Sequence, residues 1–141
     1  MKLKIIPILV AVTILLSLLA CSQANSVSLE IPYDDFIVDK HFTWAVNTDI
    51  GDTITVTLGS NPTTGFTWPD IAQISNQDIV KQTDHKFISP EKTAVPDSSG
   101  KDMWTFKAKK TGTTTISMNY SLPWDGGEKS KWTFIATIIV R

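Results

Sequence analysis

Residues 61–68 read Asn-Pro-Thr-Thr-Gly-Phe-Thr-Trp, a stretch that joins turn-forming residues to two aromatic side chains at alternate positions. Pro62 fixes its own φ and moves Asn61 out of the helical region. Gly65 can adopt the positive φ that a tight turn requires. We therefore expect a stiff, exposed loop, which would lose little conformational entropy on binding a partner.

The chain around this stretch has the pattern of one all-β domain. It contains 141 residues, of which 42% are hydrophobic and 19% are charged, and this composition suits a single domain with a sizeable core. From Val27 onward, short segments rich in Val, Ile, Thr and aromatic residues are separated by Gly, Pro, Asn and Asp clusters. This spacing predicts an immunoglobulin-like β-sandwich over residues 27–141.

Several of these segments alternate apolar and polar residues, so each predicts a strand with one buried face. Residues 66–68 are expected to form a further short strand, and no segment after Ala20 shows a long helical periodicity. Ile135 and Ile139 occupy the second face of the last segment, which predicts a central strand buried on both faces. The residues expected to point inward are Ile54, Val56, Leu58, Trp104, Phe106, Ala108, Ile116, Met118, Tyr120, Trp132, Phe134, Ala136, Ile138 and Val140.

The first twenty residues have the features of a secretory signal. Two lysines precede an apolar run that ends at the small residue Ala20. Residues 18–21, Leu-Leu-Ala-Cys, resemble the lipobox of prokaryotic lipoproteins, in which the cysteine becomes the lipidated first residue. We expect cleavage of residues 1–20, a lipid on Cys21, and a flexible tether at 21–26 that holds the protein on the exported face of a membrane. A plain secretory signal and an uncleaved anchor are the alternatives.

The charge of the chain argues against a nucleic-acid partner, and its cysteine content excludes an internal disulfide. Cys21 is the only cysteine, so the sandwich can form no internal disulfide. The formal net charge is −1 and no basic cluster runs along the chain, which argues against a nucleic-acid partner. We expect a monomer stabilised by its core.

Three loops are candidates for binding. The first loop is residues 59–65, the second loop is 95–102, and the third loop is 121–131, between the last two predicted strands. The second loop is polar and is expected to precede a strand that begins at Met103 or Trp104. In an immunoglobulin-like order, the first and third loops would lie at the same end of the sandwich.

From about Asp49 to Val140 the chain resembles the chagasin family, proteinaceous inhibitors of papain-like cysteine peptidases. The first loop matches the family's Asn-Pro-Thr-Thr-Gly-aromatic motif. The third loop resembles its Arg-Pro-Trp element, with Leu122 in place of the arginine, and the second loop matches its glycine-rich element only at Gly100. The resemblance implies that Trp68 is core and that the peptidase-binding residues are Asn61, Pro62, Thr63, Thr64, Gly65, Phe66, Gly100, Leu122, Pro123 and Trp124.

The resemblance implies a reversible inhibitor that blocks the cleft of a papain-like cysteine peptidase, with the first loop over the catalytic cysteine. Neither a cofactor nor a metal is expected. Other interpretations of the same residues remain open. The 61–65 motif is also good hairpin-turn chemistry, and Trp124 can instead cover the core. A cell-surface adhesin or carbohydrate-binding module could also display Trp124, as a platform on which sugars stack.

The sequence offers few candidates for catalytic residues. His41 and His85 are the only imidazoles, and no serine lies in a nucleophile-elbow motif. The adjacent pair Asp84 and His85 is expected to be a solvated pair on a strand. The cluster Asp34, Asp35, Asp39 and His41 matches no metal-loop template. The sequence therefore favours a protein that is not an enzyme.

Overall fold

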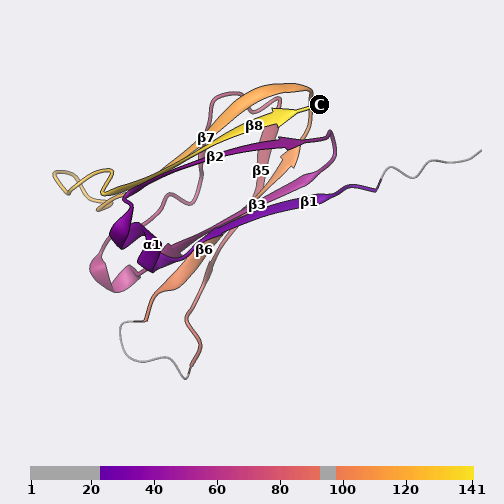
Figure 1. Ribbon diagram of the computed structural model, residues 1–141. Helices are drawn as coiled ribbons and strands as arrows, with labels where there is room; N and C mark the ends of the chain where they lie inside the picture. Colours follow the sequence, from indigo (N-terminus) through magenta and orange to yellow (C-terminus); the bar gives the residue numbers. More distant parts are fainter. Residues whose placement is uncertain (1–22, 93–97) are drawn as a thin grey trace, which may run out of the picture.

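The computed structural model describes residues 23–92 and 98–141, which form two β-sheets packed face to face (Figure 1). The first sheet has the strand order β1-β3-β6-β5, with bounds Ser26–Ile31 (β1), Thr53–Ser60 (β3), Gly100–Ala108 (β6) and Val80–Ile88 (β5). The second has the order β2-β8-β7-β4, with bounds His41–Thr48 (β2), Trp132–Val140 (β8), Gly112–Tyr120 (β7) and Gln73–Ile74 (β4). The predicted all-β, two-sheet architecture is confirmed.

The first two strands of the chain each join the edge of a different sheet in parallel. β1 pairs with β3, and β2 pairs with β8, whereas all other neighbouring strands are antiparallel. The chain must therefore cross from one sheet to the other between β1 and β2. It does so through a short helix, α1 (Tyr33–Val38).

The core lies between the sheets and follows the predicted alternation. Every residue expected to point inward is at most 3% exposed. Full burial of one large apolar side chain is worth about 1.5–3 kcal/mol, so these side chains account for most of the stabilisation of the domain. Trp44 packs at the edge of the core, while Trp68 and Phe36 add to it from outside the regular strands.

The outer face of β8 differs from the prediction. The strand is central, between β2 and β7, but Ile135 and Ile139 are 42% and 37% exposed. The partners of Ile135 on the neighbouring strands are Thr43 and Ser117, whose small polar side chains suit a solvated face. The prediction of burial on both faces is wrong because the core covers only the inner face of this sheet.

One local prediction is also wrong, and one short element was not predicted. Residues 66–68 are not a strand, because only Thr67 pairs there, in an isolated bridge with Ser121. The helix α1 was not predicted, since six residues are too few to display a helical period.

The fold begins slightly earlier than predicted. Asn25 donates its N–H to Asp52 Oδ1 (2.9 Å) and accepts from the N–H of Thr53 (2.9 Å), and β1 starts at Ser26. These two residues therefore belong to the sandwich rather than to a flexible tether. Cys21 and the apolar run before it lie outside the described residues. Among the described residues, no helix is long and apolar enough to cross a membrane.

Candidate functional site

The first loop is closed by its own asparagine. β3 carries the chain as far as Ser60, and Asn61 then caps a 3-10 turn, η1, at Pro62–Thr64. The Oδ1 atom of Asn61 accepts from the N–H of Thr63 (3.1 Å) and from its hydroxyl (2.7 Å). The hydroxyl of Thr64 donates to the carbonyl of Asn61 (2.7 Å). Buried Asn61 thus shapes the turn from inside while Pro62, Thr63 and Thr64 face solvent.

Gly65 ends the turn in the left-handed conformation that the sequence predicts. Its φ is 82°, and its N–H donates to the carbonyl of Pro62 (3.1 Å). The next residue, Phe66, donates its N–H to the hydroxyl of Thr64 (3.3 Å) and turns its ring into the core, where it is 7% exposed. Phe66 therefore anchors the loop and does not offer its ring to a partner.

The base of the first loop rests on aromatic residues of the second sheet. The hydroxyl of Tyr120 accepts from the N–H of Asn61 (3.0 Å) and donates to its carbonyl (3.2 Å). The Tyr120 ring lies 5.7 Å from that of Phe66 and 5.0 Å from that of Trp68, measured between ring centroids. Trp68 is core, as predicted, and its Nε1–H donates to the carbonyl of Gly59 (3.0 Å).

The third loop spans the predicted residues between β7 and β8 and is held by internal hydrogen bonds. Leu122 donates its N–H to the carbonyl of Glu128 (2.8 Å). The Lys129 ammonium donates to the carbonyls of Leu122 and Trp124. Gly126 takes a positive φ of 78° within the loop. The loop is thus a closed structure that presents Pro123 and Trp124 to solvent.

The first and third loops meet, which confirms that they lie at one end of the sandwich. Thr67 and Ser121 exchange two backbone hydrogen bonds of 2.9 and 3.0 Å. A Cβ atom on Gly65 would lie 3.3 Å from Cη2 of Trp124 and 3.5 Å from Cδ2 of Leu122. Trp124 therefore packs against the first loop. Because 55% of its surface is still exposed, it does not cover the core.

The second loop is placed differently from the prediction. Residues 93–97 lie outside the described part of the chain, and β6 begins at Gly100 rather than at 103 or 104. Gly100 is buried, and a Cβ atom there would lie 2.5 Å from the Phe87 ring and 2.6 Å from the carbonyl oxygen of Ile88. Packing beside these residues accounts for this glycine, and it is not exposed for binding.

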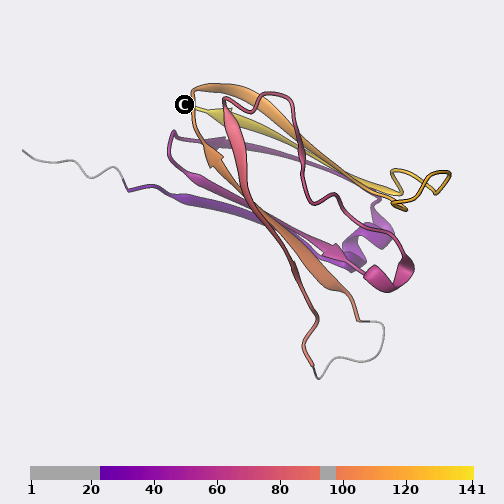
Figure 2. The ribbon, with the colours of Figure 1, turned by 180° about the vertical axis from the view of Figure 1, so that it is seen from behind.

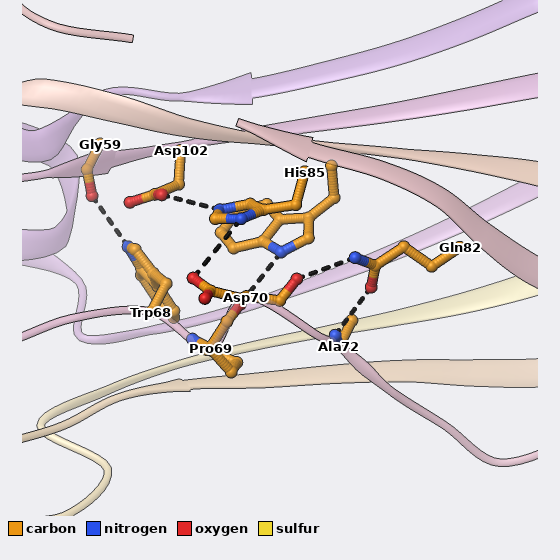
Figure 3. Close-up of polar contacts among 9 residues, drawn as sticks. Gly59, Trp68, Pro69, Asp70, Ala72, Gln82, His85 and Asp102 are labelled. Carbon is orange, nitrogen blue, oxygen red and sulfur yellow. Dashed lines mark hydrogen bonds and ion pairs between the residues drawn. The ribbon is translucent and has the colours of Figure 1, made fainter. Parts of the chain in front are cut away.

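A network of side chains from β5 and β6 holds the segment that follows the first loop (Figure 3). The Nε1–H of Trp104 donates to the carbonyl of Pro69 (3.0 Å). Gln82 donates to the carbonyl of Asp70 and accepts from the N–H of Ala72, both at 2.8 Å. The chain leaving the first loop is therefore fixed in place.

The same network contains His85. Its Nε2 lies 2.8 Å from Asp102 Oδ1 and its Nδ1 lies 3.5 Å from Asp70 Oδ1. The imidazole stacks on the ring of Trp104, with 5.0 Å between centroids. The expectation of a solvated Asp84–His85 pair is therefore wrong for His85, whose side chain is only 16% exposed and whose partners come from other parts of the chain. Within the described residues, no group of three or more His, Cys, Asp or Glu side chains could hold a metal ion.

A stiff loop and an exposed tryptophan, presented together at one end of a β-sandwich, are typical of a protein that binds a partner through its loops. A family model described as "Chagasin family peptidase inhibitor I42" matches residues 47–138. The chain therefore belongs to the chagasin family of peptidase inhibitors. Members of this family inhibit enzymes and are not enzymes themselves.

Individual relatives agree with this assignment. The chain is 27% identical over 109 residues to Amoebiasin-2 of Entamoeba histolytica, which covers 74% of this chain and 84% of that protein. The fold is similar to that of the cysteine protease inhibitor EhICP2 from Entamoeba histolytica (TM-score 0.65, 21% identity, 84% of this chain and 97% of the other). It is also similar to PbICP-C, solved in complex with falcipain-2 (TM-score 0.55, 15% identity, 81% and 97%).

Proposed function

We propose that this protein is a reversible inhibitor of papain-like cysteine peptidases and that the first and third loops block the cleft. The observation that carries the proposal is the contact between the two loops: Trp124 leans on Gly65, so the exposed part of the first loop and the exposed tryptophan form one continuous surface. Membership of the chagasin family supports a peptidase as partner, and the similarity to the cysteine protease inhibitor EhICP2 and to PbICP-C, solved with falcipain-2, supports a cysteine peptidase.

The geometry of the first loop supports inhibition without cleavage. The hydrogen bonds of Asn61 and the left-handed Gly65 fold residues 61–65 into a turn, whereas a peptidase substrate binds as an extended strand. Thr63 and Thr64 can approach the catalytic thiolate and imidazole, but neither side chain is an electrophile. The complex would therefore form without a covalent bond and the loop would stay intact.

A lipid anchor is part of the proposal. The match of residues 18–21 to a lipobox supports lipidation of Cys21, which would hold the inhibitor at the exported face of a membrane. The short segment between Cys21 and Asn25 would serve as the tether.

The experiment is to mix the purified protein with papain-like peptidases and, separately, with a trypsin-like peptidase. We expect inhibition of the papain-like enzymes alone, recovery of activity on dilution, and an inhibitor of unchanged mass. If the protein is cut between Asn61 and Phe66, or if micromolar protein leaves the papain-like enzymes active, the proposal is wrong. Retention on immobilised glycans without inhibition would favour the carbohydrate-binding alternative.

A further inference from the structure

The helix α1 closes the end of the sandwich between β1 and β2. Phe36, on its inner side, is fully buried, and its ring lies 4.8 Å from that of Phe42 and 5.3 Å from that of Trp132. The backbone of Tyr33 packs closely on Gly59: a Cβ atom added to Gly59 would lie 2.1 Å from the backbone nitrogen of Tyr33. The helix is therefore a fixed part of the fold, although it is short.

This end of the sandwich is the one that carries the proposed binding loops. Both ribbon views place α1 beside η1 and the third loop, and away from the C-terminus (Figures 1 and 2). The Phe36 ring lies 5.2 Å from that of Trp68, which follows the first loop directly. Tyr33 also lines a hollow of about 370 Å³ together with Gly59 and Gly100. The helix thus lies beside the elements that carry the proposed inhibitory surface.

The outer side of α1 is unexpectedly apolar for a solvent-facing helix. Ile37 is 58% exposed and Val38 is 79% exposed. Three exposed acidic residues, Asp34, Asp35 and Asp39, flank this pair, and none takes part in the ion pairs formed among the described residues. The surface is therefore an apolar centre with an uncompensated acidic border, followed by a single lysine at position 40.

The family pattern does not account for this surface. The family model matches residues 47–138, whereas α1 ends at Val38. Burial of Phe36 explains why the helix is present, but it does not explain two exposed aliphatic side chains on the opposite side. Side chains of this kind beside a binding loop are typical of an interface.

We propose that α1 is an additional contact element, which touches the rim of the peptidase cleft held by the first and third loops. This inference rests on the proposed function. Ile37 and Val38 would pack on an apolar part of the rim, and the acidic border would favour peptidases whose rim is basic at that point. The helix would then select among papain-like peptidases that the two loops alone bind similarly.

The test compares the variant Ile37→Ser/Val38→Ser with a matched control, Ile50→Ser. Ile50 is 52% exposed in the turn between β2 and β3, at the other end of the sandwich. Both variants should melt close to the wild type, because exposed positions tolerate such changes. Inhibition constants are then measured for several papain-like peptidases. We expect the α1 variant to weaken inhibition of at least one by about tenfold, through faster dissociation, and Ile50→Ser to change none.

A second pair of variants tests the charge. Asp34→Asn/Asp35→Asn should slow association with the same peptidase at low salt and have little effect at high salt. The control Asp78→Asn, at an exposed position, should leave the association rate unchanged at both salt concentrations. If the wild type inhibits and the α1 variants behave like their controls with every peptidase, α1 is not a contact element and the proposed function still stands. If the wild type inhibits none of them, the proposed function fails and this inference fails with it.

Discussion

Trp124 combines an exposed ring with a fixed position. Its ring packs against Gly65, and the Lys129 ammonium donates a hydrogen bond to its carbonyl. More than half of its surface is nevertheless exposed and accessible to a partner. We expect Trp124→Ala to weaken peptidase binding by about 2 kcal/mol, roughly thirtyfold. The midpoint of thermal unfolding should change little. Inhibition constants and melting curves together check this: a large loss of stability with unchanged inhibition by the folded fraction would show that the ring is structural.

Gly65 and Gly51 form a matched pair of left-handed glycines at opposite ends of the sandwich. Their φ values are 82° and 93°, so valine at either position should cost about 1–3 kcal/mol of stability. A Cβ atom meets Trp124 and Leu122 at Gly65, whereas at Gly51, in the turn between β2 and β3, nothing lies within 4 Å. We expect Gly65→Val to damage inhibition strongly and Gly51→Val to spare it. Denaturant unfolding measures the shared cost, and titration of a papain-like peptidase measures the difference. Equal loss of inhibition would mean that the contact with Trp124 is unimportant.

The sequence predicts what Gly65 does but not what holds Asn61. A positive φ at Gly65 follows from the local order of Pro, Thr and Gly, because turn chemistry is a property of neighbouring residues. The hydroxyl of Tyr120, by contrast, reaches Asn61 across 59 positions of sequence. Tyr120 could be predicted only as a buried residue of alternating β7, since nothing in its own segment identifies the partner of its hydroxyl.

At the level of elements, hydrophobic alternation predicts the long strands well and short elements poorly. β6, β7 and β8 each bury every second residue because every second side chain must face the same core, and β3 does so as far as Val56, beyond which all of its residues are buried. The helix α1 and the bridge at Thr67 offer too few residues for a period to show. The exposed outer face of β8 could not be predicted, since the sequence does not reveal what covers a second apolar face.

Asp52 ties together three elements at the end of the sandwich opposite the first loop. Hydrogen bonds from the backbone N–H groups of Asp49 and Asn25, and from the hydroxyl of Thr48, all at 2.9 Å, hold the pKa of its carboxyl below the ordinary value of 3.8. A lowered pKa means that the carboxylate stabilises the fold above the unfolded value, and that this contribution is lost as the pH falls through the folded value.

We therefore expect Asp52→Asn to unfold at lower denaturant concentration than the wild type at pH 7. The difference should shrink as the pH falls below about 4, because the carboxyl is then protonated in the unfolded chain before it is protonated in the folded protein. Urea titrations of both proteins across this pH range make the comparison, with Asp78→Asn as an exposed control. A difference that stays constant down to pH 2 would contradict the stabilising role of the carboxylate.

At the scale of the whole molecule, the proposed anchor and the proposed binding surface lie at opposite ends. β1 begins near the end of the sandwich that carries the C-terminus, whereas α1, η1 and the third loop lie at the other end (Figure 2). The nine residues of β8 run between these two ends, a distance of about 30 Å. A protein tethered through the residues before β1 would therefore present its binding loops away from the membrane.

We expect Cys21→Ser to release the protein from the membrane without changing its inhibition constant. Fractionation of cells grown with labelled fatty acid gives the first readout, and inhibition of an added soluble peptidase by membranes and by the released protein gives the second. Label in the serine variant would contradict lipidation at Cys21. Strong inhibition by the released form alone would mean that the membrane hides the loops.

The parallel pairing of β2 with β8 affects how the chain can fold. The two strands are in register from His41 opposite Thr133, which lie 92 positions apart, to Thr48 opposite Val140. Such distant pairing makes folding slow, on the order of milliseconds to seconds. The ends of a long loop must come together before β2 and β8 can contact each other. During synthesis β2 has no partner strand until residues 132–140 have left the ribosome. The second sheet therefore cannot close before β8 has been made, a delay that would suit the export proposed above.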